Sequence, residues 1–224
     1  MCSTLFLQRL PAPLLSPNCL LNDIGQHTTR VHMAHGNEKD FHALRQRRLA
    51  CENSRFEVFL DDVEGANGES IHDYLVVAPK IKIGDLITGI AVLPIVDGKL
   101  GLLHIYRHAI QRHLWEVPRG FVDPGEPDRS SAIRELEEET GLSCTDADIE
   151  SLGVIAPEPG ILAARVHLFA ARRCQAIRPF SGDEFGHKEF RWFEPAQVAA
   201  LHDTGEIQDP CTLIAYFQYQ NMLR

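Results

Sequence analysis

One stretch of this 224-residue sequence decides the fold: Gly120-Phe-Val-Asp-Pro-Gly-Glu-Pro-Asp-Arg-Ser-Ser-Ala-Ile-Arg-Glu-Leu-Glu-Glu-Glu-Thr-Gly-Leu142. Its second half predicts a helix from about Asp128 to Gly141. Asp128 or Ser130 can cap the start of this helix, because short polar side chains accept hydrogen bonds from free N–H groups there. Gly141 can end it, since glycine readily adopts the left-handed conformation that closes helices.

Three glutamates of this predicted helix share one face. Glu135, Glu138 and Glu139 are three and four residues apart, and residues at that spacing are neighbours on a helix surface. Such like charges repel each other by roughly a few tenths of a kcal/mol per pair. A divalent cation removes this repulsion, and Mg²⁺ prefers oxygen ligands and bridges to substrate phosphates. The face therefore suits Mg²⁺.

The remaining residues of the stretch have structural roles in this interpretation. The opposite helix face carries an apolar stripe suited to packing on a sheet, formed by Ala132, Ile133 and Leu136. Arg134 can orient carboxylates through charge-assisted hydrogen bonds, and Glu126 in the preceding loop can receive one. Gly120 and Gly125 allow tight backbone geometry in that loop.

The whole stretch fits Gly-x5-Glu-x7-Arg-Glu-apolar-x-Glu-Glu-x-Gly-apolar and resembles the Nudix box, the signature of the Nudix hydrolase superfamily. The resemblance implies an α+β fold, an α/β/α sandwich with a mixed sheet, that hydrolyses nucleoside diphosphates linked to another moiety. It implies structural roles within the box for Gly120, Glu126, Arg134 and Gly141. It implies Mg²⁺, with Mn²⁺ as a substitute, bound by Glu135, Glu138, Glu139 and the backbone carbonyl of Arg119, and a catalytic role for Glu138 and Glu139.

The chain divides into three segments. Residues 1–54 are expected to be an N-terminal tail with a helix-like pattern from Asn37 to about Ser54, whose basic cluster Arg45, Arg47 and Arg48 would lie on a solvated face. The first 32 residues are a disordered tail, or translation starts at Met33. Residues 55–80 read as a strand pair around a Gly65–Gly68 turn, and residues 81–224 as the Nudix domain.

The expected elements of the Nudix domain mix strands and helices. Apolar runs predict strands at 86–96, 100–106, 114–117, 149–155, 164–174 and 189–193, and helices at 195–202 and 210–223. Asp97-Gly98 is a strong hairpin signal between the first two strands.

The net charge, the cysteine spacing and the length of the apolar runs argue against several classes of protein. A formal net charge of −9 argues against nonspecific nucleic-acid binding, which needs a basic surface. None of the six cysteines falls in a Cys-x-x-Cys pair, so neither a zinc site nor a redox motif is predicted, and scattered thiols are typical of a reducing cytoplasm. No apolar run approaches 18 residues, which argues against a membrane span.

Beyond the box, the sequence resembles ADP-ribose and nucleotide-sugar pyrophosphatases from about Arg55 to Tyr219. Residues 56–77 resemble their N-terminal strand pair, which implies a homodimer. Residues 106–107 and 114–118 resemble the stretch before their box, and Pro157-Glu-Pro-Gly160 lies near their marker proline. The implied reaction converts ADP-ribose to AMP and ribose 5-phosphate.

Three further site residues come from this comparison. Arg107 either grips a substrate phosphate through its planar guanidinium or is a surface arginine. Glu116 contacts substrate or braces the loop. The family places a catalytic glutamate in a loop such as 180–189, where Glu184 is the first choice and Asp183 and Glu189 follow. Arg119 departs from the small residue common before the box glycine, and this leaves the substrate identity open.

Two alternatives remain at this stage. The substrate is another nucleotide sugar, a dinucleotide, coenzyme A or an RNA cap, of which the acidic charge disfavours RNA. A noncatalytic sensor of ADP-ribose-like ligands is the other alternative, although such modules usually lose box carboxylates and this sequence retains all of them.

Overall fold

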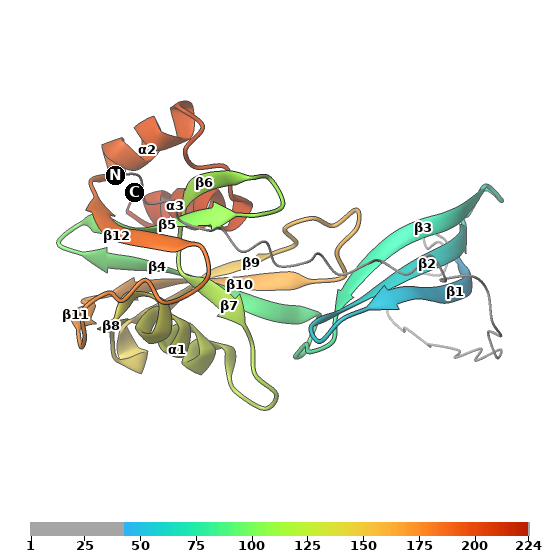
Figure 1. Cartoon of the computed structure of the whole chain (residues 1–224), viewed down its shortest axis with the longest axis horizontal. Coiled ribbons are helices and arrows are strands. Elements are labelled where there is room, and N and C mark those ends of the chain that lie inside the picture. Colours follow the sequence, from blue (N-terminus) through green and yellow to red (C-terminus); the bar gives the residue numbers. More distant parts are fainter. Residues whose placement is uncertain (1–42, 224) are drawn as a thin grey trace, which may run out of the picture. The chain divides into compact units, whose positions relative to one another are not determined.

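The computed structural model describes residues 43–223 (Figure 1). The main sheet contains β4 (Ile87–Val96), β5 (Lys99–Arg107), β6 (Arg112–Glu116), β7 (Arg119–Phe121), β9 (Ile149–Ile155), β10 (Arg165–Arg172) and β12 (His187–Phe193). The helices are α1 (Asp128–Thr140), α2 (Pro195–Asp203) and α3 (Pro210–Met222), with a 3-10 turn at Asp146–Asp148. Two short strands, β8 (Leu142–Ser143) and β11 (Gln175–Ala176), pair with each other. Within the described residues, no helix has both the length and the apolar character needed to cross a membrane.

Strand β4 lies at the centre of the seven-stranded sheet, whose order is β12-β5-β4-β10-β9. It runs parallel to β10 along its length but pairs with β5 only at Ile95 and Val96, beside the turn. Beyond those residues β7 pairs with β4, and β6 pairs with β5. The segment from β6 to β7 is therefore held against both strands, and it leads directly into the box.

The turn between β4 and β5 confirms the predicted hairpin. Asp97 and Gly98 both have positive φ, at 51° and 76°. Two consecutive positive φ angles are the requirement of the type I′ turn, whose twist matches that of the flanking strands.

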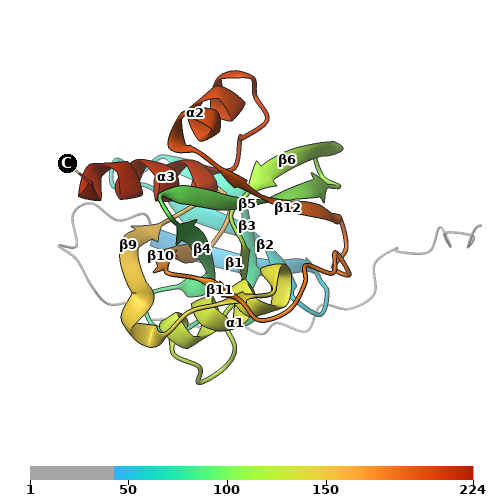
Figure 2. The same cartoon turned by 90° about the vertical axis from the view of Figure 1, so that its left-hand side faces the viewer.

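Hydrophobic cores lie on both faces of the sheet, so the fold is the expected α/β/α sandwich (Figure 2). Alternate residues of β4 enter opposite cores because successive strand side chains point to opposite faces. One core joins the sheet to α2 and α3 through Leu93, Val198, Ala215 and Tyr219. The other joins it to α1 through Val92, Ala132, Leu136 and Phe169.

The ends of α1 show one confirmed prediction and one wrong one. Gly141 closes the helix with φ 73°, and its N–H donates to the Glu137 carbonyl. The start lacks the predicted cap, because Pro127 occupies the N-cap position with no side-chain hydrogen bond. The Asp128 carboxylate instead contacts His167 of β10, whose other ring nitrogen lies 2.7 Å from the Ser151 hydroxyl. This polar chain ties the start of the helix to β10 and β9.

The predicted helix from 37 to 54 is wrong over its described part. Ala43–Glu52 forms β1, which pairs antiparallel with β2 (Phe56–Glu64), and β2 pairs with β3 (Ser70–Pro79). The strand pair predicted within residues 55–80 is present as β2 and β3, and β1 extends it to a three-stranded sheet that begins before residue 55. Residues 1–42 of the tail predicted for residues 1–54, including the alternative start at Met33, lie outside the described residues.

Charge pairing across the strands explains why β1 is not a helix. Arg47 donates two hydrogen bonds, of 2.8 and 2.6 Å, to Asp61 of β2, which is 3% exposed. Arg45 pairs with Glu64, also on β2. The leucines of β1 remain exposed, so a helix would have no apolar face to bury, whereas opposite charges on paired strands stabilise a sheet.

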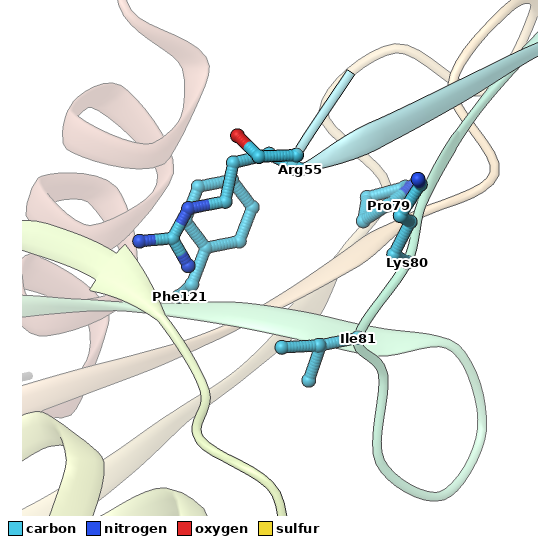
Figure 3. Close-up of a pocket in the computed structure, with 6 residues that line it drawn as sticks. Arg55, Pro79, Lys80, Ile81 and Phe121 are labelled. Carbon is cyan, nitrogen blue, oxygen red and sulfur yellow. The ribbon is translucent and has the colours of Figure 1, made fainter. Parts of the chain in front are cut away.

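The N-terminal sheet contacts the Nudix domain at two places. The guanidinium of Arg55 lies 5.5 Å from the ring centroid of Phe121, beside a small pocket that Pro79, Lys80 and Ile81 also line (Figure 3). At the second place, the Val77 N–H donates to the Ile161 carbonyl at 2.8 Å. The first contact reaches β7, which is the first strand of the box.

We expect Gly141→Ala to lower the free energy of unfolding by about 2–4 kcal/mol. The left-handed backbone itself disfavours a Cβ by about 1–2 kcal/mol, and a Cβ at Gly141 would also overlap the Arg178 carbonyl. Gly98→Ala is the matched control, because Gly98 has φ 76° but open space around its missing Cβ. Urea denaturation measures both, and equal losses would contradict the role of the Arg178 contact.

Candidate active site

Helix α1 places the three box glutamates at different depths. Glu135 and Glu139 are buried, at 8% and 7% exposed, and the Glu138 side chain is 53% exposed. The apolar stripe behind them fixes these depths, since Leu136 is completely buried against the sheet. Two carboxylates are thus held in a desolvated position, and burial raises the pKa of Glu135 above its ordinary value.

Arg134 holds the carboxylates in place, as the sequence predicted. Its guanidinium lies 2.7 Å from Glu135 and 3.1 Å from Glu138. It also donates to Glu126 at 3.3 Å and to the Phe121 carbonyl at 3.0 Å. A single planar group thus ties the loop that precedes the helix to the carboxylate face.

Gly120 is required because β7 passes close to this face. A Cβ at Gly120 would overlap the carboxylate of Glu135. On the other side, a Cβ added at Gly89 of β4 would lie 2.7 Å from the Gly120 carbonyl. The backbone of Gly120 and the carboxylate of Glu135 are therefore so close that a side chain at position 120 would displace the carboxylate.

Glu139 occupies the deepest position of the site. Burial raises the pKa of its carboxyl to about 8, the N–H of Arg119 opposes the shift with a 2.8 Å hydrogen bond, and the nearby charges of Glu135 and Glu184 raise the pKa further. Without a cation, this carboxyl retains its proton near neutral pH.

The loop before β12 brings two more groups to Glu139. His187 Nε2 lies 3.6 Å from a Glu139 oxygen and 4.0 Å from a Glu184 oxygen. The loop is anchored to β5 by a hydrogen bond from the Tyr106 N–H to the Gly186 carbonyl, at 2.9 Å. Glu184 is a residue that the sequence predicted at the site. His187 is not, because no local spacing relates a histidine here to a glutamate 48 residues earlier.

These groups fit a divalent cation. Donor atoms of Glu139, Glu184 and His187 lie within 4.8 Å of one another. The buried Glu139 carboxyl has a raised pKa and only a backbone N–H within hydrogen-bond distance to stabilise its ionised form, and a cation would supply positive charge there. The described residues therefore provide both oxygen ligands and an unmet need for positive charge.

A second charged network adjoins the carboxylates. Glu116, at the end of β6, is 1% exposed and accepts two hydrogen bonds from Arg107, of 3.0 and 2.6 Å. Arg119 lies 2.9 Å from the same carboxylate and 2.6 Å from Asp209. Asp209 in turn caps α3 by accepting from the Thr212 N–H. The site is thereby connected to α3.

Of three further residues considered from the sequence, only Arg107 has a side chain whose charge acts on Glu139 and His187. Arg107 lies near Glu139 and His187, since its charge acts on the pKa of both. The Arg119 side chain is engaged by Glu116 and Asp209. Glu189 forms an ion pair with Arg191, at 2.6 Å, and is not part of the cluster of Glu139, Glu184 and His187.

Comparison with known proteins identifies the family to which this chain belongs. The family model described as NUDIX domain matches residues 86–213, which is more than half of the chain. The chain belongs to the Nudix family.

Similar Nudix relatives carry different names. An ADP-ribose pyrophosphatase of Bacillus subtilis is 30% identical over 58% of this chain and 66% of its own length. A methanol dehydrogenase activator of Bacillus methanolicus is 33% identical over 50% of this chain and 56% of its own. A CMP-5'-(N-acetyl-N-hydroxy-3-aminopropyl)phosphonate hydrolase of Streptomyces rubellomurinus is 31% identical over 68% and 70%. The first two relatives are thus matched over about half to two thirds of their own length.

A solved structure shares the Nudix fold. The crystal structure of an ADP compounds hydrolase superposes with a TM-score of 0.69 and covers 84% of this chain and 97% of that one, at 20% identity. At this identity the likeness supports the fold.

We expect the metal-free protein to lose stability as the pH rises from about 5 to about 8. Glu139 keeps its proton up to about pH 8 in the folded state, whereas the unfolded value is 4.5. The folded state therefore binds more protons in this window, so the free energy of unfolding falls with rising pH, by at most about 1.4 kcal/mol per pH unit from this group. Urea denaturation in EDTA at several pH values measures the slope.

Two variants isolate this contribution. Glu139→Gln should reduce the downward slope, and Glu137→Gln, on the same helix, should keep it. His187 acts in the opposite direction, because burial lowers its pKa, and both variants retain it. An unchanged slope in Glu139→Gln would show that this carboxyl does not titrate in the window.

Proposed function

We propose that this protein is a divalent-metal-dependent pyrophosphohydrolase that acts on a nucleoside diphosphate linked to another moiety, with ADP-ribose as its substrate. The observation that carries the proposal is the complete carboxylate face of α1, joined in space by Glu184 and His187. Similarity to ADP-ribose pyrophosphatases supports the substrate. Products would be AMP and ribose 5-phosphate.

We propose Mg²⁺ as the cation, with Mn²⁺ as a substitute. Glu135, Glu138 and Glu139, with the carbonyl of Arg119, would hold it, because carboxylate and carbonyl oxygens suit Mg²⁺. The same carboxylate and carbonyl oxygens also suit Mn²⁺. When bound, the cation neutralises phosphoryl oxygens and lowers the pKa of a bound water.

The protein groups would position the substrate and move one proton. Arg107 would bind a phosphate, since its guanidinium lies at the site with a 35% exposed side chain. The buried carboxylate of Glu116 would hold that guanidinium in place. Attack of water on phosphorus breaks the P–O–P linkage, and Glu184 would accept a proton from this water. The Glu184 side chain is 50% exposed and lies near Glu139, so it can reach both solvent and the site.

Two alternatives are tested with the same protein. The first alternative is another substrate, such as another nucleotide sugar, a dinucleotide or coenzyme A. The similarity to a hydrolase named for a CMP phosphonate adds a cytidine derivative to this group. A noncatalytic sensor would have no use for two buried glutamates that destabilise the metal-free protein, so the retained carboxylates favour catalysis.

We expect purified protein with Mg²⁺ to release AMP from ADP-ribose, and Glu139→Gln to lose roughly 10²–10⁴-fold in kcat. Glu137→Gln is the matched control, because Glu137 lies on the same helix and binds the Ser143 hydroxyl away from the carboxylate face. Products from a panel of nucleoside diphosphate derivatives are identified by mass spectrometry. Faster turnover of another diphosphate would refute ADP-ribose as the substrate, and binding without turnover across several metals would support the sensor.

We also propose that the protein is a homodimer joined through its N-terminal sheet. This sheet exposes large apolar side chains on β1 and β3, namely Leu44, Leu49, Ile71, Tyr74 and Leu75. Exposed apolar groups gathered on one element are typical of an interaction surface. Leu44 and Ile71 lie on either side of Val63 in the strand register, so they form one apolar row.

We expect light scattering coupled to size-exclusion chromatography to give twice the chain mass for the full chain. Leu44→Glu combined with Ile71→Glu should give the monomer, because two charges per chain would become buried without partners. Phe217→Glu on α3 is the control, since Phe217 is 58% exposed elsewhere. A wild-type monomer, or a dimer that the double substitution leaves intact, would refute this interface.

A further inference from the structure

Two cysteines 30 residues apart face each other beside the end of α1. Strands β8 and β11 pair antiparallel, with Leu142 opposite Ala176 and Ser143 opposite Gln175. The next position along the same register places Cys144 opposite Cys174. Both are free thiols, of which Cys174 is buried and Cys144 is partly exposed.

The hydrogen-bond pattern determines which kind of pair they form. The Ile177 N–H donates to the Gly141 carbonyl at 2.9 Å, and this bond puts the position of Gly141 and Ile177 in the hydrogen-bonded phase of the ladder. Such pairs alternate along an antiparallel ladder, which makes Cys144 and Cys174 a non-hydrogen-bonded pair. Cα atoms in these pairs are about 4.5 Å apart, within the range of about 4.4–6.8 Å that disulfides span.

The two thiols contact each other. This contact lowers the pKa of Cys174 below its ordinary value and raises the pKa of Cys144. A thiolate is the reactive form of a cysteine. Cys144 is partly exposed and therefore open to oxidants, whereas the burial of Cys174 restricts attack there to small ones. Whichever sulfur is oxidised, the other is already in position to react with it.

We propose that Cys144 and Cys174 are a modification site at which a hydroperoxide, such as hydrogen peroxide, forms a reversible intramolecular disulfide. One of the two thiols, as its thiolate, attacks one peroxide oxygen, the O–O bond breaks, and a sulfenic acid and hydroxide result. The sulfur of the other cysteine then displaces the hydroxyl, which leaves as water. In total, two thiols and one hydrogen peroxide give one disulfide and two waters.

The position of this bond gives it a structural consequence. Cys144 follows α1 by four residues, and Cys174 precedes the loop that carries Glu184. Within that loop, Arg178 already donates to the carbonyls of Glu137 and Glu138 at 2.6 Å. A disulfide would add a covalent link between the end of the glutamate helix and the segment that leads to Glu184.

The test treats the full chain with about stoichiometric to tenfold hydrogen peroxide, blocks free thiols and digests with trypsin without reduction. The expected product is one linked pair of peptides, residues 135–165 with residues 174–188, that dithiothreitol separates. The melting temperature of the oxidised protein should rise by roughly 5–15 °C, because the disulfide restricts the unfolded chain.

Variants distinguish this pair from the other cysteines. Cys144→Ser should abolish both the linked peptides and the rise in melting temperature. Cys51→Ser, on the exposed strand β1, should retain both. The proposal is overturned if peroxide leaves both thiols free, oxidises Cys174 to a sulfinic acid without a link, or links the pair only in denaturant. These readouts do not depend on catalysis, so they stand apart from the proposed hydrolase activity.

Discussion

The burial of two carboxylates on one helix is the constraint on which the rest of the structure depends. Glu135 and Glu139 can be buried only because Leu136, between them in sequence, seats α1 against the sheet. Removing charge from water is unfavourable unless a partner compensates for it. Arg134 compensates for Glu135, and the N–H of Arg119 only partly compensates for Glu139. The buried Glu139 carboxylate is therefore electrostatically strained, and a bound divalent cation would relieve this strain.

The surrounding charges keep this strain local. Glu116 is more deeply buried than either box glutamate, yet two guanidinium groups, those of Arg107 and Arg119, satisfy it. The Arg119 side chain is held away from the carboxylate face, and its backbone faces that side instead. Arg119 thus contacts Glu139 through its backbone N–H, and Glu116 and Asp209 through its guanidinium. This division explains how a large cation can stand before the box glycine without occupying the space that the helix needs.

Local sequence information predicted the elements whose stability is local. The box helix, its closing Gly141 and the Asp97-Gly98 turn each depend on residues within a few positions, and the structure confirms them. The helix expected over β1 failed because its outcome depends on acidic partners on β2, 14 to 19 residues away. His187 and the pair of cysteines escaped detection for a similar reason. The residues that lie opposite them depend on how the strands align with each other. This register is defined only when the whole sheet has formed, so local sequence patterns do not reveal it.

The difference between local and long-range determinants also applies to substrate specificity. The box provides a carboxylate face, an arginine and a glycine, and these recognise a cation and a diphosphate rather than a base or a sugar. Relatives with about 30% identity carry names with different substrates, ADP-ribose in one and a cytidine phosphonate in another. Selectivity must therefore arise from segments outside the box. The N-terminal sheet is a segment outside the box that contacts it, because Arg55 and Phe56 pack on Phe121, the residue after the box glycine. A change in that sheet can reach the box strand through this contact while leaving the carboxylates in place.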